Sequence, residues 1–207
     1  MLLIGITGSI GMGKSTVAQM FKEYGYGVYN ADDTVHYIYE NDEEVIEKVE
    51  DKFPGSTKGG VVNRMALRDI LNQDPSKFKD LELIVHPATR KYQIIYIKKL
   101  IEEGKVGCVL DIPLLFETGG EKYVDVSVVV TASNATQQSR VVLERKVPLK
   151  IFNAIKGQQM PDRDKLKKAD YIISTDCDLE KTKAEVKEVV AKIKLINPKA
   201  WNTFFNQ

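Results

Sequence analysis

Residues 8–15 read Gly-Ser-Ile-Gly-Met-Gly-Lys-Ser and fit the phosphate-binding pattern Gly-x-x-x-x-Gly-Lys-Ser/Thr. Glycines at these positions let the backbone wrap an anion with its N–H groups pointing inward, and a helix that follows adds partial positive charge at its N-terminus. Lys14 can reach the β- and γ-phosphates of a nucleotide, and the Ser15 hydroxyl can ligate Mg²⁺. The pattern predicts a nucleoside triphosphate site, whose expected contact residues are Gly11, Met12, Gly13, Lys14, Ser15 and Thr16.

Two aspartates stand where a phosphoryl-transfer site needs carboxylates. Asp32 follows the second expected strand, and Asp111 ends a very apolar run. We expect Asp32 to be the general base, because a carboxylate can orient an alcohol and accept its proton; capping of the next helix is its alternative role and the expected role of Asp33. We expect Asp111 to hold Mg²⁺ through water, with a structural role toward the phosphate-binding loop as the alternative.

The elements that position these residues are apolar, strand-like runs that alternate with longer helical patterns, which is typical of a parallel sheet covered by helices. A helical pattern begins at Ser15, and apolar residues at helical spacing predict a closing helix from Leu179 to Ile196. Five strands are expected, at residues 2–7, 27–30, 106–111, 124–131 and 171–174.

Two segments interrupt this alternation. About 75 residues without a convincing strand pattern separate the second and third strands, which is too much for one crossover and predicts a helical insertion. Its expected helices are 33–39, 43–53, 64–71 and 87–103, with a flexible interruption at 54–60. A second segment, residues 140–168, is rich in Lys and Arg. The expected domains are a nucleotide-binding core (1–31, 105–139 and 169–207), a helical acceptor domain (32–104) and a lid (140–168).

The composition is that of an ordinary globular protein, with 43% hydrophobic and 29% charged residues among 207. The formal charge of +1 offers no whole-chain polycation to nucleic acid or to an anionic membrane. Two cysteines are too few for a disulfide framework, two histidines are too few for a His/Cys metal cluster, and Cys108 is expected to be a buried thiol. No signal-peptide layout and no run of about 20 apolar residues occurs, so a cytoplasmic protein is expected.

The phosphate-binding loop alone does not separate kinases from other nucleotide-binding proteins. Guanine-specific GTPases usually carry Asn-Lys-x-Asp near the end of the sheet, whereas residues 174–177 read Ser-Thr-Asp-Cys. The helical insertion and the basic segment fit a kinase that holds an acceptor on one side and closes an arginine-bearing lid on the other. Because phosphoryl transfer spreads charge over the γ-phosphoryl oxygens, Mg²⁺, Lys14 and a lid arginine, expected to be Arg140, must neutralise it.

Several short motifs in order resemble the dephospho-CoA kinase family. The opening, residues 7–16, is similar to the family's Thr-Gly-(Gly/Ser)-Ile-Gly-x-Gly-Lys-Ser-Thr. The other matching segments are Val28–Asp32 with His36, Leu81–Arg90, Asp111–Gly119, Gln137–Arg140, Gln158–Pro161, Lys165 and Ala169–Ile173. Two positions differ from the family pattern: Asn30 replaces an aspartate, and Thr175-Asp176 stands where the family often has asparagine before a small residue.

The resemblance implies an α/β P-loop NTPase fold, with a five-stranded parallel sheet flanked by helices, a helical acceptor-binding insertion and a lid. It implies phosphorylation of the ribose 3′-hydroxyl of 3′-dephospho-CoA by ATP with Mg²⁺, the last step of coenzyme A biosynthesis. It supports Asp32, Lys14 and Arg140 as catalytic residues. It also places His86 and Arg90 in the acceptor region, although His86, which precedes Pro87, could instead cap a helix beginning at that proline. Arg64, expected to bind the acceptor, and Lys165 are weaker candidates, for which solvation at the surface is the alternative.

Two other functions stay open on the sequence alone. An enzyme similar to nucleoside monophosphate kinases would share ATP, Mg²⁺ and a lid but use a smaller phosphate acceptor. A nucleotide-dependent switch would bind ATP or GTP without transferring phosphate to a small molecule. The expected partners are ATP and dephospho-CoA, with no nucleic acid and no membrane; the sequence does not indicate an oligomeric state.

Overall fold

The computed structural model describes residues 1–204; the last three residues of the expected nucleotide-binding core, including Phe205, lie outside this range. The chain divides into two compact units, one made of Met1–Tyr29 together with the chain from Lys99 onward, the other of Asn30–Lys98. Each unit has its own hydrophobic core and is described by itself.

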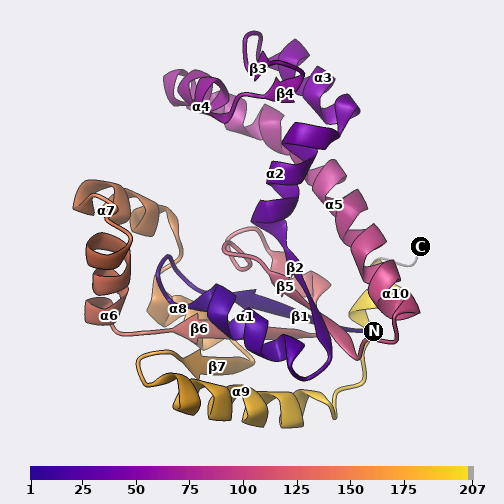
Figure 1. Ribbon diagram of the computed structural model, residues 1–207, viewed down its shortest axis with the longest axis vertical. Coiled ribbons are helices and arrows are strands. Elements are labelled where there is room, and N and C mark those ends of the chain that lie inside the picture. Colours follow the sequence, from indigo (N-terminus) through magenta and orange to yellow (C-terminus); the bar gives the residue numbers. More distant parts are fainter. Residues whose placement is uncertain (205–207) are drawn as a thin grey trace. The chain divides into compact units, whose positions relative to one another are not determined.

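The first unit is built on a five-stranded sheet, as expected (Figure 1). The strands are β1 (Leu2–Thr7), β2 (Tyr26–Asn30), β5 (Gly107–Asp111), β6 (Val126–Thr131) and β7 (Tyr171–Ser174), in the order β2-β5-β1-β6-β7. β1 pairs in parallel with β5 and β6, and β6 with β7. This confirms the predicted parallel sheet, and each predicted strand lies within two residues of its observed bounds.

The apolar runs of the sequence are the buried strands of this sheet. All residues of β1 and β5 are buried, because helices cover both faces of the sheet at its centre. The helices α1 (Lys14–Lys22) and α9 (Leu179–Ile193) cover one face of the sheet (Figure 1). They supply Phe21 and Val190 to a cluster with Ile4 and Val128. The closing helix was predicted to reach Ile196 and ends three residues earlier.

The other face carries a smaller cluster. Leu115 and Phe116 pack against Val129 of β6, and Leu166 of α8 (Asp162–Lys168) packs on them. A short helix, η2 (Gly120–Tyr123), precedes β6, and another, α10 (Ala200–Phe204), follows α9; Trp201 of α10 is buried.

The basic segment after β6 is helical. It comprises α6 (Asn134–Gln138), the π-helix η3 (Ser139–Glu144), α7 (Leu149–Gln158) and α8. The π-helix continues directly from α6, so its wider turn re-aims the side chains that follow Gln138. Over residues 1–204, no helix is both long and apolar enough to cross a membrane.

The second unit is mainly helical, with α2 (Ala31–Asn41), α3 (Glu43–Lys52), α4 (Arg64–Gln73), η1 (Pro75–Lys77) and α5 (Phe78–Glu102). Asn30, Asp42 and Asn63 accept backbone hydrogen bonds at the first turns of α2, α3 and α4 and so determine where these helices begin. The expectation that this insertion has no strands is wrong. β3 (Thr57–Lys58) and β4 (Val61–Val62) form a hairpin, whose two-residue strands are too short to show alternation.

Helix α5 also differs from its prediction. A helix was expected to begin at Pro87, but α5 begins at Phe78 and contains Pro87 in its interior. The proline has no N–H for the Leu83 carbonyl, a loss that costs about 3 kcal/mol in a helix interior. Val85 and its apolar neighbours on α5 pack into the core of the unit, and this burial offsets that cost. His86 therefore does not cap a helix start.

Candidate active site

The phosphate-binding loop connects β1 to α1. Gly11 and Gly13 adopt φ values of 80° and 82°, the left-handed region that favours glycine. Gly13 is the N-cap residue of α1, which has no side-chain cap and no acidic residue in its first turn. Helices α2, α3 and α4, by contrast, are all capped by side chains. The N-terminal N–H groups of α1 are thus left for an anion.

Lys14 forms an ion pair with Asp111. Its Nζ lies 2.5 Å from Asp111 Oδ1, and the two side chains are 15% and 4% exposed. The pair follows from the sheet, because Asp111 ends β5 in register with Ile6, two residues before the loop begins. The structure therefore places Asp111 against the loop, as its predicted structural role requires, and leaves its predicted role toward Mg²⁺ untested.

The other predicted nucleotide contacts differ in exposure. Ser15 and Thr16 are exposed in the first turn of α1, where their hydroxyls can reach a ligand. The Met12 side chain is 1% exposed, and its sulfur accepts the N–H of Ala132. Only the backbone of Met12 is available to a nucleotide.

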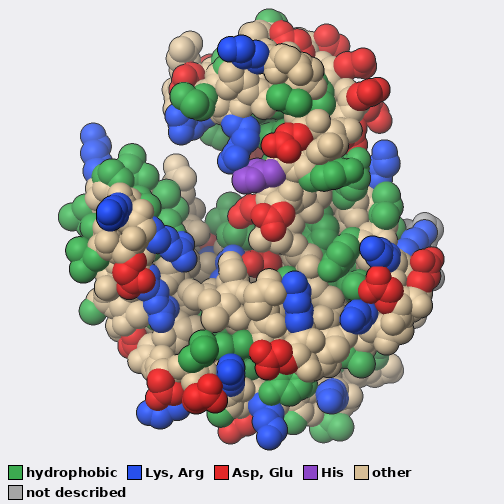
Figure 2. Space-filling view, viewed as in Figure 1, with side chains coloured by type: hydrophobic (Ala, Val, Ile, Leu, Met, Phe, Trp, Pro, Cys, Tyr) green, Lys and Arg blue, Asp and Glu red, His purple; other side chains and the backbone are tan. Residues whose placement is uncertain are grey.

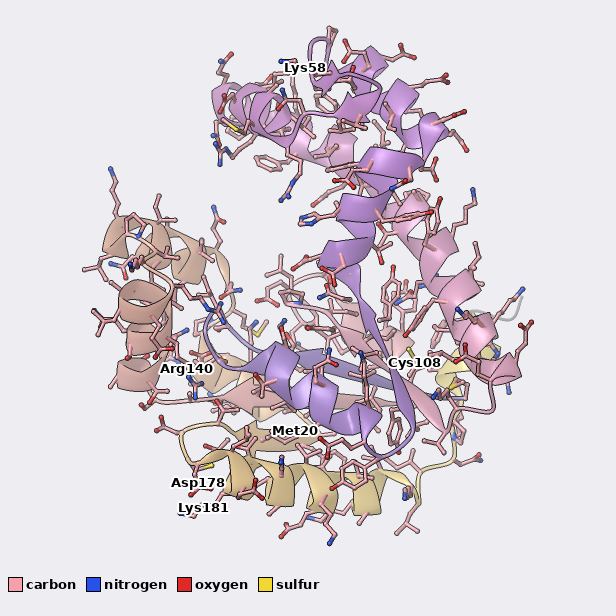
Figure 3. The ribbon with its side chains drawn as sticks, in the orientation of Figure 1. Met20, Lys58, Cys108, Arg140, Asp178 and Lys181 are labelled. Atoms are coloured by element: carbon pink, nitrogen blue, oxygen red, sulfur yellow. The ribbon has the colours of Figure 1, made fainter. Side chains whose placement is uncertain are left out.

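Arg140 lies in η3 (Figure 3). Thr175, which follows β7, holds it beside the loop. Its Nη1 donates to Thr175 Oγ1 at 2.8 Å and its Nη2 to the Thr175 carbonyl oxygen at 2.7 Å. Thr175 Oγ1 in turn donates to the Met12 carbonyl oxygen. The predicted lid arginine is thus tied to the loop through a threonine that sequence reasoning did not identify as an orienting residue. Thr175 is polar and 95% buried in the fold, a property the sequence does not display.

A pocket of about 400 Å³ adjoins these residues. This volume is within the range of small-molecule sites. Gly13 and Thr16 place it beside the loop, Arg140 and Arg145 give it positive charge, and its lining residues are Gly13, Thr16, Arg140, Glu144, Arg145, Thr175, Cys177, Leu179 and Thr182. The arrangement can hold the base and sugar of a nucleotide whose phosphates occupy the loop.

A buried ion pair lies next to the residue that precedes the loop. Lys165 is fully buried, its Nζ lies 2.9 Å from Glu117 Oε1, and it also donates to the Pro113 carbonyl oxygen. Thr7, the last residue before the loop, donates its hydroxyl to the same carbonyl oxygen. Lys165 was expected to be solvated at the surface nearly as readily as functional, and the surface alternative is wrong.

In the second unit, Asp32 lies in the first turn of α2 and is exposed. Asn30 caps this helix, because its Oδ1 accepts the N–H groups of Asp32 (2.9 Å) and Asp33 (3.2 Å). The predicted capping role of Asp33 is therefore wrong, as is the capping alternative for Asp32. The substitution of asparagine for the family's aspartate at position 30 keeps the side-chain oxygen that the cap needs.

The predicted acceptor residues of this unit lie on two helices. His86 and Arg90 are four residues apart on α5 and so share a helix face. Arg64 is the first residue of α4, and it lies near Tyr39, where burial raises the pKa of the phenol to about 12 while the positive charge of Arg64 opposes that rise.

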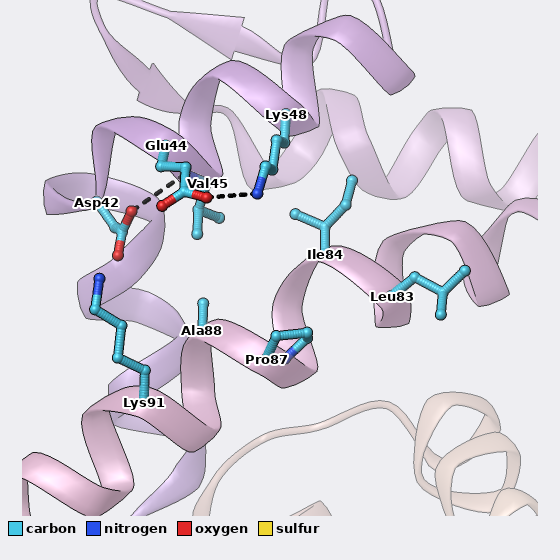
Figure 4. A pocket seen from close by; sticks show the side chains of 9 residues that line it. All are labelled: Asp42, Glu44, Val45, Lys48, Leu83, Ile84, Pro87, Ala88 and Lys91. Atoms are coloured by element: carbon cyan, nitrogen blue, oxygen red, sulfur yellow. Dashed lines mark hydrogen bonds and ion pairs between the residues drawn. The ribbon is translucent and has the colours of Figure 1, made fainter.

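A pocket of about 350 Å³ lies between α3 and α5 in the same unit (Figure 4). Lys48 and Lys91 face it together with Asp42 and Glu44, and Glu44 accepts a hydrogen bond from Lys48. Asp32, Arg64, His86 and Arg90 are not among its lining residues. Elsewhere, charges of both signs are interspersed over the face shown in Figure 2.

Comparison with known proteins gives consistent similarities. The family model described as dephospho-CoA kinase matches residues 2–181. The dephospho-CoA kinase of Rhodopseudomonas palustris is 44% identical over 190 residues, covering 92% of this chain and 94% of the relative. The dephospho-CoA kinase of Bartonella quintana is 42% identical over 193 residues, covering 93% and 98%.

Solved structures agree over similar lengths. TT1252 from Thermus thermophilus superposes with a TM-score of 0.80 at 33% identity, covering 93% of this chain and 97% of that one. The dephospho-CoA kinase from Campylobacter jejuni gives a TM-score of 0.67 at 27% identity, covering 93% and 96%.

Proposed function

The chain belongs to the dephospho-CoA kinase family, and from this premise we propose how its residues divide the work of phosphoryl transfer. The reaction moves the γ-phosphoryl group of ATP to the ribose 3′-hydroxyl of dephospho-CoA, giving CoA and ADP. The observation that carries the assignment of roles is the uncapped N-terminus of α1, with Lys14 and Arg140 held beside it. These groups together form a site for a polyanion.

The first unit holds ATP. The backbone of the loop and the first turn of α1 bind the phosphates, and the pocket lined by Thr16, Arg140 and Thr175 receives the adenosine. When ATP binds, Lys14 leaves its ion pair with Asp111 and binds the β- and γ-phosphates, because a triphosphate carries more negative charge than one carboxylate. Arg140 is pre-positioned by Thr175 and neutralises charge that develops on the transferring group.

The residues present also fit Mg²⁺. Among residues 1–204, no group of three or more His, Cys, Asp or Glu side chains could hold a metal ion. Mg²⁺ accompanying a nucleotide does not need one, since it takes one or two protein ligands and completes its shell with phosphate oxygens and water. The exposed Ser15 hydroxyl and the Asp111 carboxylate are the residues that would hold it. When bound, it supplies neutralisation of phosphate charge.

Asp32 acts as the general base toward the 3′-hydroxyl. The support is local: Asn30 performs the capping at this helix start, and Asp32 is exposed in the first turn. Its carboxylate makes no hydrogen bond or ion pair within the part of the chain that the structure describes. An uncommitted carboxylate can orient a hydroxyl and accept its proton as transfer proceeds.

His86, Arg90 and Arg64 bind the acceptor. A guanidinium can form bidentate hydrogen bonds to phosphate oxygens, and dephospho-CoA carries a diphosphate. Residues 140–168 form a lid that excludes water during transfer, since transfer to water would waste ATP.

A coupled assay of ADP release tests this function. With ATP and Mg²⁺, dephospho-CoA should support steady turnover, and CoA should appear in equal amount by mass spectrometry. AMP and dTMP are the matched alternative acceptors and should support no turnover. Turnover with AMP or dTMP and none with dephospho-CoA would instead select a nucleoside monophosphate kinase-like activity. Binding of ATP or GTP without phosphate transfer to any of these acceptors would indicate a nucleotide switch.

A further inference from the structure

Both backbone groups of Ile10, in the middle of the phosphate-binding loop, are bound by glutamine side chains. The Ile10 N–H donates to Gln159 Oε1 at 3.0 Å, and the Ile10 carbonyl oxygen accepts from Gln137 Nε2 at 2.8 Å. Backbone chemistry determines both amide orientations, because an N–H can only donate and a carbonyl can only accept. Lys156 confirms the orientation at Gln137, since its ammonium group donates to Gln137 Oε1 at 2.8 Å.

The two glutamines lie on either side of η3 and α7, with Gln137 just before the lid (residues 140–168) and Gln159 within it. Gln137 lies in α6, before Arg140, and is fully buried. Gln159 directly follows α7. The whole of η3 and α7 lies between them in the chain, so a single loop residue is bound by both ends of this segment.

The neighbours of Ile10 are held in the same way. The Ser9 hydroxyl donates to Asp162, at the start of α8. A Cβ at Gly11 would lie 2.5 Å from a methyl group of Val141, so the lid segment packs directly on the loop backbone. Loop residues 9–11 are therefore in contact with the lid segment on both sides of α7.

Because a peptide group is planar, these hydrogen bonds also determine the direction of the neighbouring N–H groups at the phosphate site. The Ile10 carbonyl and the Gly11 N–H belong to one rigid, trans peptide group, in which they point in opposite directions. When Gln137 binds the carbonyl, the Gly11 N–H is aimed the opposite way. The Ile10 N–H shares its peptide with the Ser9 carbonyl, which accepts the Met12 N–H across the loop. The two glutamines thus determine the rotation of two successive peptide groups.

We propose that Gln137 and Gln159 are positioning residues for phosphoryl transfer, which orient the peptide groups on either side of Ile10 so that the loop presents its N–H donors to ATP. The inference rests on the proposed function of this loop and goes beyond it by assigning the residues that hold its conformation. Because the same two side chains lie on either side of η3 and α7, α7 can move while the loop stays in its phosphate-binding conformation.

The chain supplies matched controls. Each glutamine has a glutamine neighbour, Gln138 and Gln158, and both neighbours are exposed. The variants are Gln137→Met, Gln159→Met and the same change at the two neighbours. Gln137→Glu and Gln159→Glu add equal charge but differ in chemistry, since a carboxylate can replace an acceptor at 159 and cannot replace a donor at 137. Each variant is assayed for kcat, for the KM values of ATP and dephospho-CoA, and for Tm.

We expect Gln159→Met and Gln137→Met to lower kcat/KM for ATP by about tenfold to about a hundredfold, with the KM of dephospho-CoA unchanged. Gln159→Glu should recover most of the loss at 159, and Gln137→Glu should not recover the loss at 137. The neighbour variants should match wild type. If Gln137→Met does not fold, the Gln159 series alone decides.

Wild-type kcat/KM in Gln159→Met would overturn the proposal, as would equal behaviour of the two glutamate variants. A loss of kcat/KM that only follows the loss in Tm, with the KM of dephospho-CoA raised as much as the KM of ATP, would also overturn it, because that result indicates only a structural role. These outcomes are separate from failure of the proposed function, in which the wild-type protein itself would not turn over dephospho-CoA.

Discussion

The start of α2 allows base catalysis to be separated from helix capping by three single substitutions. Asn30 accepts both backbone hydrogen bonds at this helix start, and Asp32 and Asp33 follow it as exposed carboxylates. The variants are Asn30→Ala, Asp32→Asn and Asp33→Asn. The first removes the cap and keeps both carboxylates, while the other two each remove one carboxylate and keep the cap.

The variants should affect different quantities, stability in one case and turnover in another. Asn30→Ala should destabilise the protein by about 1 kcal/mol, the usual effect of losing a side-chain cap, and lower Tm by about 2–4 °C. Asp32→Asn should leave Tm nearly unchanged but lower kcat by about 10²- to 10⁴-fold, because the amide cannot accept the proton of the 3′-hydroxyl. A loss near the lower end is expected, since loose phosphoryl-transfer transition states need less help from a base. Asp33→Asn should change neither quantity.

The assays are ADP release under saturating ATP and dephospho-CoA, ATP binding by titration, and thermal unfolding. ATP affinity should be the same in all three variants, because residues 8–16 are untouched. Wild-type turnover in Asp32→Asn, or loss of turnover in Asp33→Asn instead, would refute base catalysis by Asp32. Loss of Tm in Asp32→Asn rather than in Asn30→Ala would show that the cap is assigned to the wrong residue.

Three further predictions concern the first unit. Lys14→Ala should lower turnover by about 10²- to 10³-fold with the fold retained by circular dichroism, since one oriented charge at the transferring group is lost; near-wild-type kcat would exclude Lys14 from the chemistry. Cys177 lines the nucleotide pocket, whereas burial raises the pKa of Cys108 to about 12. At pH 8, iodoacetamide should therefore alkylate Cys177 and not Cys108, and ATP should slow the alkylation of Cys177. Peptide mass spectrometry measures the extent of alkylation at each cysteine. Equal rates with and without ATP would contradict the pocket assignment. Burial raises the pKa of Glu117, but hydrogen bonds from the Met160 N–H and Lys165 lower it by more, so the pKa lies below its ordinary 4.5. This pair should stabilise the fold above about pH 4.5 and lose that contribution as the pH falls further, so denaturant midpoints should fall less steeply below that pH in Glu117→Gln than in wild type.

Much of the fold could be predicted because local pattern and tertiary environment agree. The five strands of the sheet are apolar runs bounded by turn residues, and in β1, β5 and β6 burial on both faces produces that composition. The hairpin of β3 and β4 was missed because two residues cannot show alternation. The start of α5 was misplaced because Pro87 has a strong local preference for a helix start, which packing of neighbouring apolar residues in the core overrides.

Part of the site could likewise be predicted from the sequence. Residues 8–15 could be assigned to phosphate binding because backbone N–H groups of one contiguous loop bind the phosphates. The glycines that allow this loop conformation lie at fixed spacing within the same short segment of the sequence. Asp32 and Asp111 could be proposed because both follow strands whose carboxyl ends place ligands at one edge of a parallel sheet.

What tertiary structure alone decided is which distant side chains hold that loop in place. Thr175 lies 163 positions from Met12, whose carbonyl oxygen accepts a hydrogen bond from its hydroxyl, and Gln137 and Gln159 lie 127 and 149 positions from Ile10. Lys165 reads as a surface residue and is buried against Glu117. A hydrogen bond forms only when the donor–acceptor distance lies within a few tenths of an ångström of its optimum and the angle at the hydrogen is close to straight. The types of two residues far apart in the sequence determine neither the distance nor the angle between them. The sequence by itself determined that phosphates are bound, and the packed fold determined which side chains orient the groups that bind them.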